Sequence, residues 1–427
     1  MVFRLIFLLA FLFPSLIESE PAYIIFCNSH NIGRLDLVNN NFRSLASGLR
    51  KPVSLDFYYE ESWIFWTDDI KKQIFRGKLI SYNLTQIEPI IHGDLELLEG
   101  IAVDWVGQNI YWVDKDQIEV SQLDGSHRSV LIAGNMRYPS AIALDPREGA
   151  LFWTDWDSTN PQIETSSMAG ERRRTIFNLS TIDGGGWANG ITIDYSLKRL
   201  YWVDSWSDSI HSIDYNGQDY LLVLRYHNKI KPPVGITLYE NFLYLTEWRT
   251  NSLLKVNKFN GANVTIIHES TTFHPTDIKV YHQNRQPPTR NPCNHSSGCS
   301  HLCVIGYNKV AKCLCPHSTS LTPDGKTCVG QSTVEEATDR PTTTPTTLPK
   351  QKTTHAGFDQ NMTNSTLIET PKSTSNDKDK KNIWLYVVII LVSVLVITVA
   401  IVIIRLRYRR RKSHGQMKLS WSRTQSE

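Results

Sequence analysis

Short apolar runs that end in a carboxylate recur along the first part of the chain. Five of them combine aromatic and β-branched residues with a final Asp or Glu, at residues 64–68, 110–114, 151–155, 200–204 and 243–247. They start 46, 41, 49 and 43 residues apart, a period typical of repeat architectures. Each run suits a strand buried on both faces, and its carboxylate can accept backbone N–H groups where the strand ends. The pattern predicts a repeated β-sheet unit, the blade of a propeller.

A second repeat gives the number of blades. Apolar four-residue runs lie about ten residues ahead of the aromatic copies, at 53–56, 101–104, 142–145, 191–194 and 236–239. A sixth copy at 278–281 has no aromatic run after it. Conversely, the strand-like runs 23–26 and 32–37, at the start of the repeat region, have no apolar four-residue run before them. We therefore expect an all-β fold, a six-bladed β-propeller over residues 22–285. Its last blade takes one strand from the C-terminal end and three from the N-terminus, which leaves no long open sheet edge.

Local turn chemistry supports this division into strands. In the second blade we expect strands at 101–104, 109–113, 118–121 and 128–132, with Asp124-Gly125 as a hairpin turn between the last two. The three sequons within the propeller lie at predicted turns or outer strands, as bulky glycans require, and three more follow the propeller. The predicted N-glycosylation sites are Asn83, Asn178, Asn263, Asn294, Asn361 and Asn364.

The N-terminus and the segment after the propeller predict export and a stalk. Residues 1–19 place Arg4 ahead of an apolar run too short to span a bilayer, which indicates a secretory signal peptide. Residues 331–382 contain 13 Thr, 4 Ser and 4 Pro with almost no aromatic residues. Such a segment cannot bury enough apolar surface to fold. We interpret it as an O-glycosylated Ser/Thr/Pro-rich stalk.

The C-terminal part predicts membrane insertion. Residues 383–404 carry no charge, and as a helix they reach ~33 Å, enough to cross a bilayer. The following residues, 405–427, hold eight Lys or Arg against one Glu, which predicts a cytoplasmic basic tail. We expect the basic cluster to anchor the helix at anionic lipid headgroups, with a docking site as the alternative. The expected localisation is the plasma membrane, as a single-pass type I protein with an extracellular N-terminus.

Cysteine usage predicts a second folded module at residues 293–328. Six of the seven cysteines crowd into these 36 residues: Cys293, Cys299, Cys303, Cys313, Cys315 and Cys328. In a secreted chain this predicts a disulfide scaffold, but spacing alone leaves many pairings open. A zinc site is the alternative, which the lack of paired Cys-x-x-Cys spacing disfavours. We interpret the remaining Cys27 as a small buried apolar residue, with intermolecular pairing as the alternative.

The net charge of the whole chain, +3, hides a difference between its parts. The basic tail carries +7 (8 − 1), and in the N-terminal leader Arg4 cancels Glu18. The region between the leader and the tail therefore carries −4 (3 − 7). Nucleic-acid binding therefore has no support from composition.

Taken together, the Tyr-Trp-Thr-Asp-like repeats and the cysteine-rich module resemble the low-density-lipoprotein receptor family. The resemblance is to its class B propellers followed by one EGF-like module, most of all in the Wnt co-receptor branch, and it covers residues 22–328. It implies disulfides Cys293–Cys303, Cys299–Cys313 and Cys315–Cys328. In EGF-like modules that bind calcium, acidic residues precede the first cysteine, and this chain has Thr-Arg-Asn-Pro there. We expect no metal.

The resemblance also implies a ligand site at the mouth of the propeller. In the Wnt co-receptor branch this mouth holds peptide segments of secreted ligands, and a Trp-x-Asn-Gly motif contributes an asparagine. This chain has Trp187 and Asn189 in such a motif, and Glu99 keeps the charge where the family has an aspartate. The alternative is that Trp187 packs within a blade and Asn189 forms a turn. Ser140 stands where the family has an arginine, which argues against the same ligand.

Other motifs are absent and narrow the function. The sequence has no Gly-x-Ser-x-Gly, His-Glu-x-x-His or phosphate loop, so we expect no catalytic residues, no enzyme and no cofactor. It also has no cysteine-rich class A modules and no Asn-Pro-x-Tyr in the tail, so an endocytic receptor is disfavoured.

The resulting prediction is a receptor-like surface protein that binds a secreted or extracellular-matrix protein ligand through its propeller. It would act as a co-receptor, modulator or decoy, with a Wnt-pathway component among the candidate partners. An endoplasmic-reticulum chaperone for propeller folding is a further expected partner, and nucleic acid is not. The alternative is a structural adhesion or matrix-binding protein.

Overall fold

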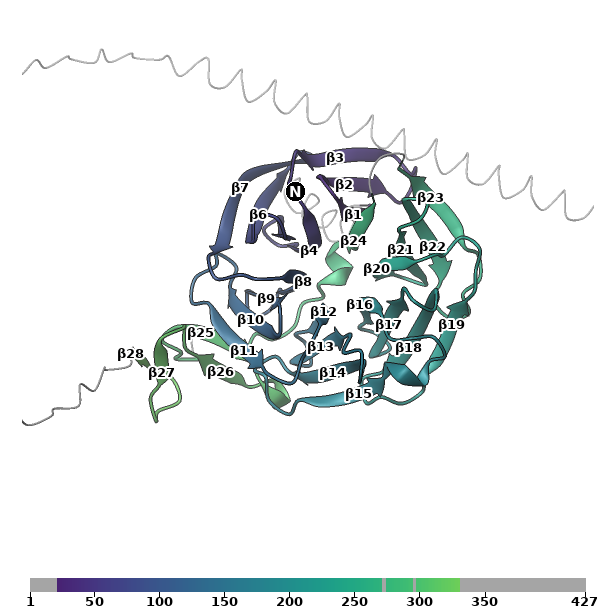
Figure 1. Ribbon diagram of the computed structural model, residues 1–427. Helices are drawn as coiled ribbons and strands as arrows, with labels where there is room; N and C mark the ends of the chain where they lie inside the picture. Colours follow the sequence, from purple (N-terminus) through teal and green to yellow (C-terminus); the bar gives the residue numbers. More distant parts are fainter. Residues whose placement is uncertain (1–20, 271–273, 295–296, 331–427) are drawn as a thin grey trace, which may run out of the picture. The chain divides into compact units, whose positions relative to one another are not determined.

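The computed structural model describes residues 21–270, 274–294 and 297–330. Six four-stranded antiparallel sheets surround a common axis (Figure 1), and each forms one blade. The described helical segments are three short 3₁₀ turns, η1 (Leu179–Thr181), η2 (Gln283–Arg285) and η3 (Tyr307–Lys309). The prediction of an all-β, six-bladed propeller is confirmed.

Blades 1 to 5 are each built from four consecutive strands, the first of which lies innermost. Blade 1 consists of β4 (Pro52–Tyr58), β5 (Trp63–Asp68), β6 (Gln73–Ile80) and β7 (Asn83–His92). Blade 2 consists of β8 (Leu98–Asp104), β9 (Asn109–Asp114), β10 (Gln117–Gln122) and β11 (Ser129–Ala133). Blade 3 consists of β12 (Pro139–Asp145), β13 (Ala150–Asp155), β14 (Gln162–Ser167) and β15 (Arg174–Asn178). Blade 4 consists of β16 (Ala188–Asp194), β17 (Arg199–Asp204), β18 (Ser209–Asp214) and β19 (Leu221–Arg225). Blade 5 consists of β20 (Pro233–Tyr239), β21 (Phe242–Glu247), β22 (Ser252–Asn257) and β23 (Thr265–Glu269).

Blade 6 closes the ring with strands from both ends of the propeller. Its strands run in the order β24 (Pro275–Tyr281), β1 (Tyr23–Asn28), β2 (Asn31–Asp36) and β3 (Phe42–Ser47). The rings of Tyr23 and Tyr281 stack across the β1–β24 pair, with centroids 4.9 Å apart. Asp277 of β24 then joins blade 6 to blade 1, because its Oδ2 accepts hydrogen bonds from Ser54 Oγ (2.6 Å) and Leu55 N (3.0 Å). The closure is the one that the two sequence repeats predict.

The aromatic copies of the repeat form the middle of each blade. The indoles of Trp66, Trp112, Trp153 and Trp202 are fully buried. In blade 2 the strand beside Trp112 places Glu119 opposite it, and Arg128 pairs with this fully buried carboxylate at 2.6 Å. The Arg128 guanidinium also lies over the Trp112 ring and donates to two backbone carbonyls of the loop before the blade. The pairing satisfies the buried charge and ties the outer strand to that loop.

The carboxylates that end the repeated runs hold the loops at the ends of the strands, as the sequence predicts. Asp114 Oδ1 accepts hydrogen bonds from the backbone N–H groups of Glu96 (2.9 Å) and Leu97 (2.8 Å), in the loop that leads into β8. Asp155 accepts the N–H of Tyr138 (2.9 Å) in the loop before β12. Each carboxylate therefore fixes the entry to the inner strand of its own blade.

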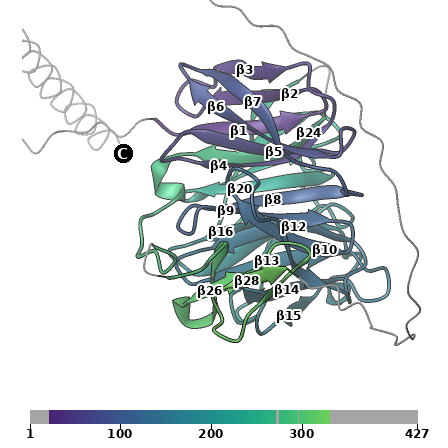
Figure 2. The same ribbon diagram turned by 90° about the vertical axis from the view of Figure 1, so that its left-hand side faces the viewer.

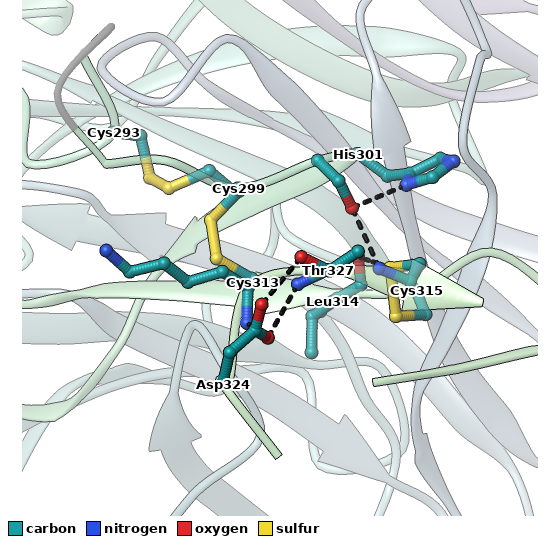
Figure 3. The surroundings of a disulfide bond; sticks show 12 residues. Cys293, Cys299, His301, Cys313, Leu314, Cys315, Asp324 and Thr327 are labelled. Atoms are coloured by element: carbon teal, nitrogen blue, oxygen red, sulfur yellow. Dashed lines mark hydrogen bonds between the residues drawn. A yellow bond between two sulfur atoms is a disulfide. The ribbon is translucent and has the colours of Figure 1, made fainter. Parts of the chain in front are cut away.

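The cysteine-rich module has two small hairpins and three disulfides. Figure 3 shows the surroundings of a disulfide in this module. The hairpins pair β25 (Leu302–Ile305) with β26 (Ala311–Leu314), and β27 (Thr319–Leu321) with β28 (Cys328–Gly330). The disulfides join Cys293 to Cys303, Cys299 to Cys313 and Cys315 to Cys328, the pairing that the family resemblance implies. Asp324 organises the turn between β27 and β28 by accepting from Thr327 Oγ1 (2.6 Å).

The module packs against blades 2 and 3 of the propeller (Figure 2). The side chains of Leu302, Val304 and Ile305 are buried in one apolar cluster with residues of these blades, such as Tyr111 and Met168. Asn109 Nδ2 also donates a hydrogen bond to the carbonyl oxygen of Cys303 (2.8 Å). The propeller and the module therefore share a core.

Several predicted features lie outside the described residues. These are the signal peptide, the stalk, the membrane helix, the basic tail and the sequons Asn361 and Asn364. Within the described ranges, no helix has the length and apolar character needed to cross a membrane. The other four predicted glycosylation sites are exposed: Asn83, Asn178, Asn263 and Asn294.

Closure of blade 6 predicts a large effect of a small core substitution. Ile278 of β24 is fully buried between blades 5 and 6, so Ile278→Ala should destabilise the full-length chain by ~2–5 kcal/mol through lost burial and a residual cavity. Ile70→Ala is the matched control, since Ile70 is 63% exposed. Denaturant unfolding followed by tryptophan fluorescence measures both. Equal midpoints for the two variants would contradict the assigned role of β24.

Cys27 should be chemically silent in the folded chain. Its side chain is buried in β1 with Sγ 3.1 Å from Thr276 Oγ1, and it forms no disulfide. Burial, assisted by the nearby negative charge of Asp277, raises the pKa of the thiol to about 12, so the reactive thiolate is scarce. We expect iodoacetamide at mildly alkaline pH to label Cys27 only after unfolding, as read by peptide mapping without reductant. Rapid labelling of the native chain, or a bridge to a second chain, would show that the thiol is accessible.

Candidate functional site

The inner strands of all six blades begin at the same end of the propeller axis. The loops that lead into them surround a hollow of about 260 Å³, which we call the mouth. Every one of the six inner strands contributes lining residues, so residues distant in sequence meet there. A concave site that several elements line is a typical location for ligand binding.

Two glycines let the inner strands approach each other at the mouth. A Cβ atom at Gly190 would lie 2.6 Å from the carbonyl oxygen of Val234 in the neighbouring inner strand. At Gly100 it would lie 2.6 Å from the carbonyl oxygen of Ser140. Both positions therefore require a residue without a side chain. This gives a physical reason for the glycine that follows Asn189.

The structure brings the three predicted ligand-binding residues together in the mouth. Glu99 lies in the inner strand of blade 2, whereas Trp187 and Asn189 come from the entry to the inner strand of blade 4, and all three line the hollow. Trp187 is 48% exposed, which is unusual for a large indole that only packs within a blade. The Oδ1 atom of Asn189 is buried and has no hydrogen-bond partner among the described residues.

One carboxylate holds the loop that carries this motif. Asp204 Oδ2 accepts hydrogen bonds from the N–H groups of Gly186 (2.8 Å) and Trp187 (3.0 Å). Its Oδ1 accepts from the N–H groups of Trp206 (3.1 Å) and Ser207 (2.9 Å) on the other side of the strand end. The same repeat residue that ends β17 therefore positions Trp187 in the mouth and Trp206 beside it.

Trp156 and Trp187 form an aromatic wall on one side of the mouth, and Trp206 packs against Trp187 beside it. The rings of Trp156 and Trp187 stack with centroids 6.3 Å apart, and those of Trp187 and Trp206 lie 4.8 Å apart. Trp156 also donates its Nε1–H to the carbonyl oxygen of Ala188 at 2.9 Å. Trp248, 48% exposed, lines the mouth from blade 5.

The sequence-based site does not include Trp156, Trp206 or Trp248, although a signal for them exists. Each follows the carboxylate of an aromatic repeat by one or two positions, as in Asp155-Trp156 and Glu247-Trp248. Because these strands end near the mouth, Trp156 and Trp248 line it and Trp206 packs against Trp187 beside it.

The floor of the mouth carries a partly buried ion pair. Lys279 Nζ lies 2.8 Å from Asp277 Oδ2, and Lys279 is the only Lys or Arg among the described residues that line the mouth. Burial alone would lower the pKa of Lys279, but the charges of Asp277 and Asp56 outweigh it and raise that pKa. The mouth therefore has a cation on its floor, whereas the resemblance places an arginine at the position of Ser140.

Glu99 keeps the carboxyl that the sequence predicts but not a full charge. Burial, with the like charge of Asp69 as the next cause, raises the pKa of Glu99 to about 7. At neutral pH a large fraction of this side chain is therefore protonated and can donate a hydrogen bond as well as accept one. The role of Glu99 as the counterpart of the family's aspartate stays a prediction.

Within the described residues, no group of three or more His, Cys, Asp or Glu side chains is arranged to hold a metal ion. The chemistry available in the mouth consists of apolar aromatic surface, one unpartnered amide oxygen, a titrating carboxyl and a floor cation. These groups suit recognition of a polar, partly apolar chain segment.

Comparisons with known proteins agree with this architecture. The family described as low-density lipoprotein receptor repeat class B matches residues 108–146 and 149–195, and the TMEM154 protein family matches residues 320–426. The vitellogenin receptor of Solenopsis invicta is 32% identical over 321 residues, which cover 73% of this chain but only 17% of that receptor.

A solved structure is similar as well. A chain in the crystal structure of a nidogen/laminin complex shares 29% identity, with a TM-score of 0.56 over 61% of this chain and 98% of that chain. The chain therefore carries low-density lipoprotein receptor class B repeats within a six-bladed propeller.

The position of Glu99 predicts a specific pH dependence of stability. Its pKa in the folded chain, about 7, lies above its ordinary value of 4.5, so the fold favours the protonated form. The associated stabilisation is complete below the ordinary pKa and is lost as the pH rises through the folded-state pKa. Glu99→Gln cannot ionise, and its stability relative to the wild type should therefore increase by on the order of 1 kcal/mol from about pH 5 to about pH 8.

Denaturant unfolding of both proteins across this pH range measures the difference in their free energies of unfolding. The contributions of the other titrating groups cancel in this difference. Glu96→Gln removes a carboxylate from the loop just before Glu99, where the side chain is 65% exposed, and serves as the control. A stability difference between Glu99→Gln and wild type that does not change with pH would show that Glu99 is charged throughout.

Proposed function

We propose that this chain is a cell-surface, receptor-like protein whose propeller mouth binds a short segment of a secreted or extracellular-matrix protein. The observation that carries the proposal is the buried, unpartnered Oδ1 of Asn189 beside the exposed ring of Trp187. A buried acceptor without a donor costs ~1–3 kcal/mol, and a donor from a bound ligand removes this cost. An N–H of a peptide backbone or of an amide side chain meets this requirement.

The aromatic wall supplies the apolar part of the binding energy. Exposed, fixed tryptophans at the centre of a concave site are typical of binding hot spots and cost ~2 kcal/mol or more on truncation. Trp187 and Trp206 are exposed, and the backbone hydrogen bonds to Asp204 hold both in place before any ligand arrives. Such preorganisation lowers the entropy cost of association.

The relatives support a binding role over an enzymatic one. One is named a receptor, and the solved neighbour is a chain of a nidogen/laminin complex. By analogy we infer an extracellular protein ligand and action as a co-receptor, modulator or decoy. A Wnt-pathway component stays among the candidate partners. The serine at position 140, where an arginine is expected, favours a ligand with different chemistry.

The remaining parts of the chain fit a protein held at the plasma membrane. We infer a cleaved leader at 1–19, a glycosylated stalk at 331–382, a single membrane helix at 383–404 and a cytoplasmic tail at 405–427. The uncharged run, the basic tail and the match of residues 320–426 to the TMEM154 family support this topology. Because both ends of the propeller must meet to close it, we also infer an endoplasmic-reticulum chaperone as a partner during folding.

A structural adhesion protein is the second candidate. The EGF-like module shares a core with blades 2 and 3, so propeller and module present one rigid surface suited to matrix contact outside the mouth. In that case ligand binding would not depend on Asn189.

Asn189→Ala separates the two candidates. Peptides selected from a random phage-displayed library on the immobilised full-length chain should bind the mouth and lose at least about tenfold in affinity to Asn189→Ala, because the amide partner is gone. Fluorescence anisotropy of the synthetic peptides gives the affinities. The melting temperature should stay close to that of the wild type, since the removed oxygen bonds nothing in the described protein.

The matched control is Asn39→Ala, an exposed asparagine in the β2–β3 turn at the other end of the blades. It should leave peptide affinity unchanged. Peptides that bind Asn189→Ala and the wild type equally would move the preferred site away from the mouth and favour the adhesion candidate.

A further inference from the structure

A second hollow, of about 510 Å³, lies at the end of the blades opposite the mouth. It is bounded by hairpin turns of blades 3 and 4 and by η3 of the EGF-like module. We call it the Arg172 groove. The residues that define it here are Glu148, Phe152, Arg172, Arg174, Tyr215 and Tyr307.

Arg172 is fixed in the groove without a counterion. Its guanidinium carbon lies 3.4 Å from the ring centroid of Tyr307, and the side chain is exposed. No hydrogen bond or ion pair to this guanidinium occurs within the described residues. Stacking on an aromatic face orients the guanidinium plane and leaves its N–H edges open to an oxyanion. The second arginine, Arg174, uses one N–H on the carbonyl oxygen of Tyr215 (3.2 Å).

The carboxylates next to these arginines already have partners. Glu148 pairs with Lys198 (3.2 Å) and Lys309 (3.3 Å), and Glu171 pairs with Lys312 (3.0 Å). Asp214, at the end of β18, accepts backbone N–H groups of its own turn, including that of Gln218 at 2.6 Å. Glu148 is thus the one carboxylate among the described residues that line the groove, and two lysines already pair with it, whereas both lining cations are arginines.

Three of the hydroxyl groups that line the groove already have acceptors. Thr165 Oγ1 donates to the carbonyl oxygen of Leu151 (2.9 Å), Ser166 Oγ donates to that of Ser167 (2.8 Å), and Tyr215 OH donates to Asp145 (2.9 Å). The uncommitted donors of the described groove are therefore mainly guanidinium N–H groups. Guanidinium pairs best with planar or tetrahedral oxyanions such as carboxylate, phosphate or sulfate.

The groove lacks the apolar anchors that a peptide ligand needs. Phe152 is buried beneath its surface, and Arg172 covers the face of Tyr307. Interfaces with proteins typically centre on exposed aromatic or aliphatic anchors. A hydrophilic polyanion fits the groove better. Each contact between the polyanion and a cationic side chain releases counterions and so adds to the binding free energy, as established for nucleic acids.

We propose that the Arg172 groove binds a sulfated glycosaminoglycan, with Arg172 and Arg174 as the primary sulfate ligands and the module's Lys309 and Lys312 along its path. This site is independent of the mouth and of the function proposed for it. Because Tyr307 belongs to the EGF-like module and Arg172 to blade 3, the docked module completes the site.

The test measures binding of the purified full-length chain to immobilised heparin oligosaccharide by surface plasmon resonance. The double variant Arg172→Ala/Arg174→Ala should bind at least about tenfold more weakly, with a shallower dependence on salt, since two charge-assisted contacts are lost. Arg137→Ala/Arg249→Ala removes two arginines at the mouth end of the blades and should bind like the wild type.

Tyr307→Leu keeps every charge but removes the stacked ring, and it should weaken heparin binding by about threefold or more as Arg172 loses its fixed orientation. Thermal melting of each variant checks that the fold is retained. An unchanged affinity of the double variant, or an equal loss in the mouth-end control, would overturn the proposal. Displacement of the oligosaccharide by polyglutamate as effectively as by free heparin would assign the groove to an acidic peptide instead.

Discussion

The mouth depends on one repeated interaction, the hydrogen bonds between the carboxylate that ends each aromatic strand and the backbone of neighbouring loops. Asp204 shows it most fully, because its two oxygens accept four backbone N–H groups, including that of Trp187. Asp114 does the same for the loop that leads to Glu99. Charge-assisted bonds of this kind are strong in buried surroundings. A residue that first serves to end a strand therefore also positions the groups that face a ligand.

The sequence predicts most of the fold because the constraint is periodic. Two interleaved repeats give the number of blades, and the unmatched copy at 278–281 gives the closure by β24. Since all inner strands begin at one end of the axis, residues as distant as Glu99 and Asn189 must meet there. The disulfide pairing has a different origin, because cysteine spacing leaves it open and only the family resemblance implies it. The repeats and the comparisons now agree on a class B propeller.

The rest of the site could not be predicted because it depends on neighbours from other blades. The ionisation of Glu99 reflects burial and Asp69 of blade 1, and nothing in the Leu-Glu-Gly triplet contains that information. The missing partner of Asn189 Oδ1 is visible only once the surrounding strands are in place. The Arg172 groove likewise requires Tyr307, from a separate module docked on blade 3. In contrast, the tryptophans after Asp155 and Glu247 follow the repeat and were open to prediction.

The most direct test of the central claim is amide hydrogen exchange of the full-length chain with and without a peptide selected by phage display. Binding at the mouth should slow exchange in the loops that lead into β8 and β16, above all at the amides held by Asp204. A bound donor to Asn189 restrains these loops further, so protection there should exceed that in the rest of the propeller. Protection confined to the EGF-like module or to the outer strands, with the mouth loops unchanged, would contradict the account.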